Sequence, residues 1–150
     1  MTALPSVFTQ EQVTKKDMET MREDLKHDRV GFVYFVTVEY RPAIKIGFAK
    51  DMETRMHGLQ TGNHMKLDQH FIIKTCKHAE KIFQRIFARD RIRLEWFKHT
   101  DELDDFILCL QDFQLANMTA ENMHEHFFFM PEHIAAVVYE WETNYSERIQ

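Results

Sequence analysis

Two apolar runs separated by a short polar turn predict an antiparallel hairpin in the first third of the chain. The first run covers residues 32–38 and the second covers residues 43–48. The turn between them, Glu39-Tyr40-Arg41-Pro42, combines polar residues with a proline, which favours a tight reversal of the chain. Alternation along the first run places four side chains on one face of the strand: Phe32, Tyr34, Val36 and Val38.

Apolar residues spaced three and four positions apart predict helices before and after this hairpin. Thr9, with Gln12 three residues later, is the predicted N-cap of the first helix, which extends to about Leu25. Asp51 is the predicted N-cap of the next helix, and Gly62 is its predicted end. The remaining predicted elements are a third strand near residues 70–74, a helix over about 78–90, a helix capped by Thr100, and a last helix from Pro131.

These elements predict an α+β fold in which a small, mainly antiparallel three-stranded sheet is flanked by helices. A chain of 150 residues with 44% hydrophobic residues is long and apolar enough for one such domain. We assign residues 1–30 to an N-terminal helix, residues 31–98 to the core, and residues 99–150 to an acidic helical extension packed on that core.

Targeting signals and cysteine motifs are missing from the sequence. No apolar run reaches the length of a transmembrane helix, and residues 1–30 lack the apolar segment of a signal peptide. The two cysteines, Cys76 and Cys109, form no CxxC motif and indicate no disulfide scaffold. We therefore expect an intracellular protein without a membrane partner.

Charge is distributed unevenly along the chain. Residues 29–98 contain 14 Lys and Arg against 7 Asp and Glu, whereas residues 99–150 contain 1 against 11. A basic centre indicates a polyanionic partner such as nucleic acid. The acidic end has two open interpretations: a solubilising helical surface, or a segment that competes with the polyanion.

Four side chains of the central region could share a site: Tyr34, Lys45, Arg55 and Glu95. Each has a simpler explanation when it is considered alone. A strand tyrosine is usually a core aromatic, and a single strand lysine usually marks an edge. An arginine at the boundary of the buried face of a helix usually extends its charge to solvent. A glutamate before two aromatic residues is usually exposed and has no special role. The evidence for a shared site therefore has to come from the order of these residues along the chain and from the motifs around them.

Short motifs surround these four residues. They are Val33-Tyr34, Lys45-Ile46-Gly47, the helical Arg55, Leu59-Gln60-Thr61-Gly62-Asn63, Glu80, and Glu95-Trp96-Phe97. In this order, residues 31–98 resemble the GIY-YIG nuclease superfamily, in particular its subgroup common in phages, large DNA viruses and bacteria. The sequence departs from that pattern at three positions: Phe32 replaces a glycine, Lys45 replaces a tyrosine, and Gln84 replaces a frequent histidine.

The resemblance implies a metal-dependent DNA endonuclease. Glu95 would bind one Mg²⁺ or Mn²⁺, and Arg55 would stabilise negative charge on the phosphate. Tyr34 would orient or deprotonate the attacking water through a lowered phenol pKa, which Lys45 could depress, or Lys45 could itself act as the base. Seven further residues are expected to contact DNA: Lys50, Thr61, Asn63, Lys77, Lys81, Arg85 and Arg89. The oligomeric state stays open, with a dimer as one option.

Two other functions also stay open. One is a nucleic-acid-binding module of the same fold with little or no cleavage activity, which Gln84 and the missing second-motif tyrosine favour. The other is a protein-interaction domain that acts through the acidic C-terminal helices. We interpret His124, His126 and His133 as solvated and unrelated, because no cysteine or carboxylate completes a recognisable ligand spacing.

Overall fold

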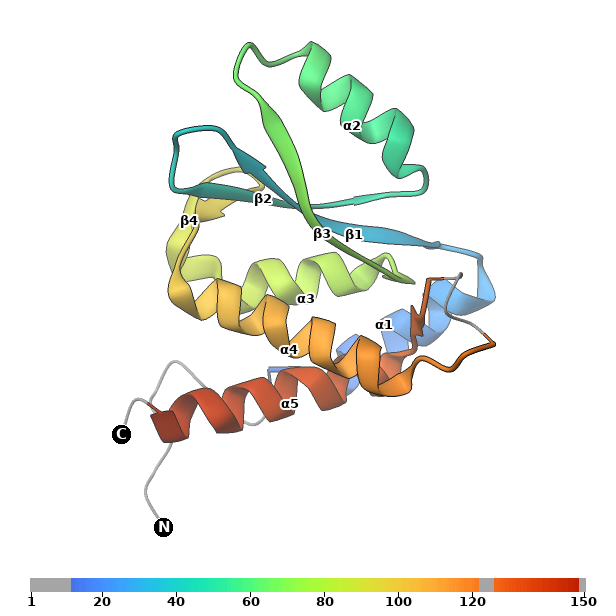
Figure 1. Cartoon of the computed structure of the whole chain (residues 1–150). Helices are drawn as coiled ribbons and strands as arrows, with labels where there is room; N and C mark the ends of the chain where they lie inside the picture. The colour runs from blue at the N-terminus through green and yellow to red at the C-terminus, as the bar shows by residue number, and fades with distance from the viewer. Residues whose placement is uncertain (1–11, 122–125, 149–150) are drawn as a thin grey trace.

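The computed structural model describes residues 12–121 and 126–148, and within them a mixed six-stranded sheet is flanked by five α-helices (Figure 1). The strands are β1 (Val30–Val38), β2 (Ala43–Ala49), β3 (Leu67–Cys76), β4 (Arg91–Arg93), β5 (Trp96–Lys98) and β6 (Phe128–Phe129). The helices are α1 (Lys15–Lys26), α2 (Met52–Thr61), α3 (His78–Ile86), α4 (Asp101–Asn117) and α5 (Pro131–Arg148), with a short 3-10 helix at Ala88–Asp90.

The predicted three-stranded sheet is wrong, because the sheet has six strands in the order β4-β5-β2-β1-β3-β6. The predicted hairpin and third strand form its centre, where β1 pairs antiparallel with both β2 and β3. The three additional strands are only two or three residues long, too short for alternation to show in the sequence. One of them, β6, pairs parallel with β3, which makes the sheet mixed rather than antiparallel.

The two faces of the sheet carry different helices (Figure 1). Helix α2 alone covers one face, where it packs on Tyr34, Val36 and Leu67. Helices α1, α3, α4 and α5 cover the other face and enclose the larger core. In that core Phe83, Phe106 and Trp141 come from three different helices. The ring of Phe106 contacts the rings of both Phe83 and Trp141. The acidic C-terminal helices therefore bury their apolar sides against the sheet layer.

Most predicted helix ends are confirmed. The Asp51 carboxylate accepts a hydrogen bond from the Thr54 N–H at the start of α2, and Thr100 caps α4 in the same way. Helix α5 begins at Pro131 as predicted. Thr9, the predicted N-cap of the first helix, lies outside the described residues, and Thr14 caps α1 instead. No helix in the described part of the chain is both long and apolar enough to cross a membrane.

A buried carboxylate fastens α1 to α3. The side chain of Asp17 completes a capping box with Thr14. It also accepts hydrogen bonds from Arg85 and contacts the Nε2 of His78 at 2.8 Å. Burial opposes ionisation of Asp17, but the hydrogen bonds from Arg85 and His78 outweigh it and hold the pKa of Asp17 far below its usual range. The N-terminal helix is thus tied to the helix that flanks the central strands.

Candidate active site

A cleft opens beside the uncovered half of strand β2. Strand β5 pairs with β2 only from Ala43 to Lys45, so the edge of β2 beyond Lys45 has no neighbouring strand. The carbonyl of Ile46 instead accepts a hydrogen bond from the Gln84 side chain, and its N–H donates to the Glu95 carbonyl. The cleft has a volume of about 540 Å³ and is lined from β2, α2, α3 and the β4–β5 turn. It thus gathers side chains distant in sequence.

Tyr34 occupies its place in this site because Gly47 lies opposite it in the β1–β2 register. A Cβ atom at Gly47 would lie 2.3 Å from the Tyr34 hydroxyl oxygen and 2.4 Å from the ring carbon that bears it. The glycine of the Lys45-Ile46-Gly47 motif therefore leaves room for the Tyr34 ring. It is not required by a turn of the backbone. The hydroxyl is fully buried, and the side chain that interacts with it is Arg55.

Substitution Gly47→Ala should consequently disable the site while leaving most of the fold intact. Tyr34 has to move, and overpacking of this kind costs about 1–3 kcal/mol. A displacement of about 1 Å at a catalytic group can lower a rate by roughly 10²-fold. The matched control is Gly58→Ala, because a Cβ at Gly58 in α2 meets nothing within 4 Å. Urea unfolding and DNA-cleavage rates measure both effects, and equal behaviour of the two variants would contradict this account of Gly47.

Lys45 forms an ion pair with Glu95, which lines the cleft. The Lys45 Nζ donates to a Glu95 carboxylate oxygen at 2.8 Å, and the Lys45 side chain is only 13% exposed. Glu95 follows Leu94, which adopts a left-handed backbone conformation with φ of 52° although it is not glycine. This strained turn between β4 and β5 directs the chain so that Glu95 reaches a lysine fifty residues earlier.

Two carboxyl groups meet in the cleft. Glu80 from α3 and Glu95 hydrogen-bond to each other. Burial, together with the hydrogen bond and charge of Glu95, raises the pKa of Glu80 to about 7. Burial also opposes ionisation of Glu95, but hydrogen bonds from Lys45 and Glu80 outweigh it and lower the pKa of Glu95. Of the two carboxyl groups, Glu80 therefore keeps its proton to the higher pH.

The phenol of Tyr34 is less acidic than the sequence led us to expect. Burial raises the pKa of Tyr34 to about 12, the negative charge of Glu95 adds to the rise, and the nearby Arg55 opposes it. The expected lowering by Lys45 is not found. At neutral pH Tyr34 is a neutral phenol that can position a hydrogen-bonding partner.

The residues expected to contact DNA are divided among several places. Lys50 and Lys77 line the cleft beside Arg55, and Lys81 is exposed on α3 and lowers the pKa values of both cleft carboxyl groups. Thr61 and Arg89 are exposed, and the Thr61 hydroxyl bonds the carbonyl of His57. Arg85 is engaged elsewhere, because it pairs with Asp17. The expected DNA contacts around α3 are therefore interrupted at Arg85.

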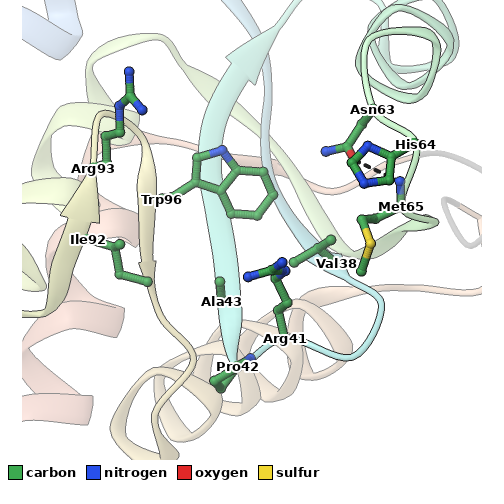
Figure 2. Close-up of a pocket in the computed structure, with 10 residues that line it drawn as sticks. All are labelled: Val38, Arg41, Pro42, Ala43, Asn63, His64, Met65, Ile92, Arg93 and Trp96. Atoms are coloured by element: carbon green, nitrogen blue, oxygen red, sulfur yellow. Dashed lines mark hydrogen bonds between the residues drawn. The ribbon is translucent and has the colours of Figure 1, made fainter.

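Asn63 lines a second hollow of about 490 Å³, and so does Trp96, the residue after Glu95. Figure 2 shows the Trp96 indole between the β4–β5 hairpin, with Arg93, and the α2–β3 loop, with Asn63 and His64. Arg41, from the β1–β2 turn, points into the space below the indole (Figure 2). The Lys45 Nζ lies 5.8 Å from the indole ring centre, so the indole that lines the hollow also contacts the lysine of the ion pair.

Sequence reasoning did not assign several residues of this region to the site. Glu80 was noted only as a motif position, although its burial beside Glu95 makes it part of the carboxyl pair. Gln84 has a structural role through its hydrogen bond to β2. The arginines of the second hollow, Arg41 and Arg93, carry no sequence signal, because only the sheet order brings their turns together. Of the histidine trio, His124 lies outside the described residues.

Comparison with known families gives one match. A family model described as the T5orf172 domain matches residues 31–142, which is most of the chain. No curated protein and no solved structure matches the chain. The family match supports a nuclease-like or DNA-binding module.

The assignment to the GIY-YIG superfamily made from the short motifs is corrected by this match, which is to a different family model. Motifs of one to five residues constrain a family less than a pattern that continues through α4 and into α5. By the match over residues 31–142, the chain belongs to the T5orf172 domain family.

Proposed function

We propose that this protein is a DNA endonuclease that hydrolyses phosphodiester bonds with the help of Mg²⁺ or Mn²⁺. The observation that supports the proposal is the convergence of two carboxyl groups, Glu80 and Glu95, with a cleft arginine, Arg55, and a buried phenol, Tyr34. Carboxylates bind hard cations, and a guanidinium matches a phosphate. Lysines at the rim of the same cleft favour a polyanionic substrate.

The donor set of the cleft fits a hard divalent cation. Glu80 and Glu95 lie within hydrogen-bonding reach of each other, and positive charge between two carboxyl groups would relieve their repulsion. Glu95 is the ligand we propose, with Glu80 beside it. A bound Mg²⁺ or Mn²⁺ would supply charge stabilisation at the phosphate and a more acidic water. Lys45 keeps Glu95 ionised and therefore ready to act as a ligand.

The remaining side chains have distinct roles in this proposal. Arg55 is exposed at the cleft and would stabilise the negative charge that grows on the phosphate. Tyr34, as a neutral buried phenol, would position the Arg55 side chain rather than deprotonate a water. The base that deprotonates the attacking water would then be Lys45 or one of the two carboxyl groups.

A plasmid-nicking assay tests the proposal. Supercoiled DNA is incubated with the protein and Mg²⁺ or Mn²⁺, with EDTA as the control, and we expect nicked and linear products that EDTA suppresses. The competing function is a DNA-binding module without cleavage, which the tight Lys45–Glu95 pair would favour if it persisted with DNA bound. A gel shift without any nicking, in either metal, would establish that alternative and rule out the endonuclease.

The Trp96 hollow should take part in binding the DNA strand. The half-buried Trp96 indole lines this hollow together with arginines, and an aromatic ring in such a place can stack an unpaired base; such stacking contributes about 1–3 kcal/mol per base. We therefore expect Trp96→Ala to weaken binding to single-stranded DNA by roughly 5- to 150-fold, as measured by fluorescence anisotropy. Trp96→Phe keeps a smaller stacking face and should restore part of the affinity.

Salt dependence separates stacking from charge. The loss in Trp96→Ala should leave the slope of log affinity against log salt unchanged, because stacking releases few counterions. The combined Lys77→Ala and Lys81→Ala variant should instead flatten that slope by about one to two units. A flattened slope in Trp96→Ala, or an unchanged slope in the lysine variant, would contradict this division of roles.

A further inference from the structure

Three metal-ligating side chains meet outside the cleft, in a cluster that the function proposed above does not use. His70 belongs to β3, His99 to the connection between β5 and α4, and Asp104 to the first turn of α4. One ligand atom from each lies within 4.8 Å of the other two. The cluster thus joins three segments up to 34 positions apart in the sequence. Within the described residues, no other group of three such side chains meets this distance.

A bulge in β3 directs His70 toward the cluster. In the β1–β3 register Phe35 pairs with Phe71 and Val36 pairs with Gln69, so His70 is the residue without a partner on β1. An extra residue of this kind bends the strand and re-aims its side chain, and bulges occur preferentially beside functional sites. Without the bulge, strand alternation would place His70 on the face opposite Phe71. The bulge therefore interrupts the ladder at His70, and it also moves Leu67 to the α2 face, beside Val38.

The distances suit a tetrahedral ion. The Nε2 of His99 lies 2.7 Å from an Asp104 carboxylate oxygen, and the Nε2 of His70 lies 3.6 Å from the same oxygen. Bonds of about 2.0–2.1 Å around a tetrahedral zinc ion separate neighbouring ligand atoms by about 3.3–3.4 Å. The cluster brackets that value, so small rotations of the three side chains would complete the geometry.

We propose that His70, His99 and Asp104 form a binding site for a divalent transition ion of the zinc class. Two imidazoles and one carboxylate are a ligand set that zinc uses, and three protein ligands leave a fourth position for water or another donor. The site joins the edge of β3 to the start of α4, so the ion stabilises the packing of α4 on the sheet. It is separate from the Glu80–Glu95 pair, whose hard oxygen donors select a different class of cation.

Zinc titration of the intact protein tests this site independently of DNA cleavage. Isothermal titration calorimetry of the apo protein with ZnCl₂ should detect one zinc site per chain. That site should depend on the three side chains of the cluster. We expect His70→Ala and His99→Ala each to weaken this binding at least tenfold. His27→Ala is the matched control, because His27 is an exposed histidine of the chain outside the cluster. Its affinity for zinc should equal that of the parent.

Thermal unfolding gives a second readout. Saturating ZnCl₂ should raise the melting temperature of the parent and of His27→Ala, because an ion that binds only the folded state stabilises it. The same ZnCl₂ should leave the melting temperatures of His70→Ala and His99→Ala unchanged. Zinc affinity and stabilisation that persist in these two variants, or a parent that binds no zinc, would overturn the proposal and leave the cluster as a hydrogen-bonded surface contact. Circular dichroism confirms that each variant is folded before titration.

Discussion

Substitution Glu95→Gln should abolish DNA cleavage and leave DNA binding almost unchanged. The amide keeps the size of the side chain but removes the negative charge that Lys45 and Glu80 hold in place. Loss of one ligand or charge-stabilising group in a nuclease of the kind proposed should lower the rate by at least about 10²-fold. Anisotropy with labelled DNA measures binding, and plasmid nicking with Mg²⁺ or Mn²⁺ measures cleavage.

Glu19→Gln is the matched control for this experiment, because Glu19 is exposed on α1 and lies outside the cleft. It should cut at the parental rate. The Glu95→Gln variant should also ionise Glu80 more readily, since the charge and hydrogen bond of Glu95 contribute to the raised pKa of Glu80. Parental cleavage by Glu95→Gln would show that the carboxyl pair is not the catalytic centre.

Substitution Asp17→Ala should produce the largest loss of stability away from the site. Asp17 is 3% exposed and provides the capping-box contacts with Thr14 and the hydrogen bonds to His78 and Arg85. Truncating one member of a buried charged pair costs about 3–5 kcal/mol. Because Arg85 is itself half-exposed and water replaces part of its contact, we expect a loss of about 2–4 kcal/mol in the free energy of unfolding.

The pH dependence of this loss has a defined sign. The folded-state pKa of Asp17 is depressed, so its ionised form stabilises the fold fully above the unfolded-state pKa of about 3.9. That contribution disappears as the pH falls below this value toward the folded-state pKa. Urea unfolding should therefore show a larger difference between parent and Asp17→Ala at pH 7 than at about pH 3. Asp68→Ala, at an exposed position, should change stability by less than about 0.5 kcal/mol at pH 7.

The central part of the fold could be predicted because its signals are local. Alternation in residues 32–38 identified the strand whose Tyr34 and Val36 pack against α2. The caps at Asp51 and Thr100 were visible because a capping side chain bonds a backbone N–H only three residues away. The sheet was underestimated because β6 is stabilised by its pairing with Lys74 and Thr75, more than fifty residues earlier. A two-residue strand has no periodicity of its own to detect.

The candidate site, like the fold, could be predicted from the sequence only in part. The order of Tyr34, Lys45, Arg55 and Glu95 indicated a shared site, and the structure brings Lys45 and Glu95 to 2.8 Å. The sequence offered no sign that the pKa of Glu80 would be raised, because that depends on burial and on Glu95. It also suggested a more acidic Tyr34, whereas burial makes the phenol less acidic.

The sequence by itself determined the hairpin, the helix caps, the basic centre and the residue types available for chemistry, since each depends on neighbours within a few positions. Only the tertiary structure decided how those residues act. Gly47 leaves room for Tyr34 because β1 and β2 pair in one register, and Arg85 is withheld from the basic surface because α1 brings Asp17 to it. His70 meets His99 and Asp104 because a bulge turns one residue of β3 toward α4. Register, burial and bulges are set by packing between distant segments, so no local pattern carries them.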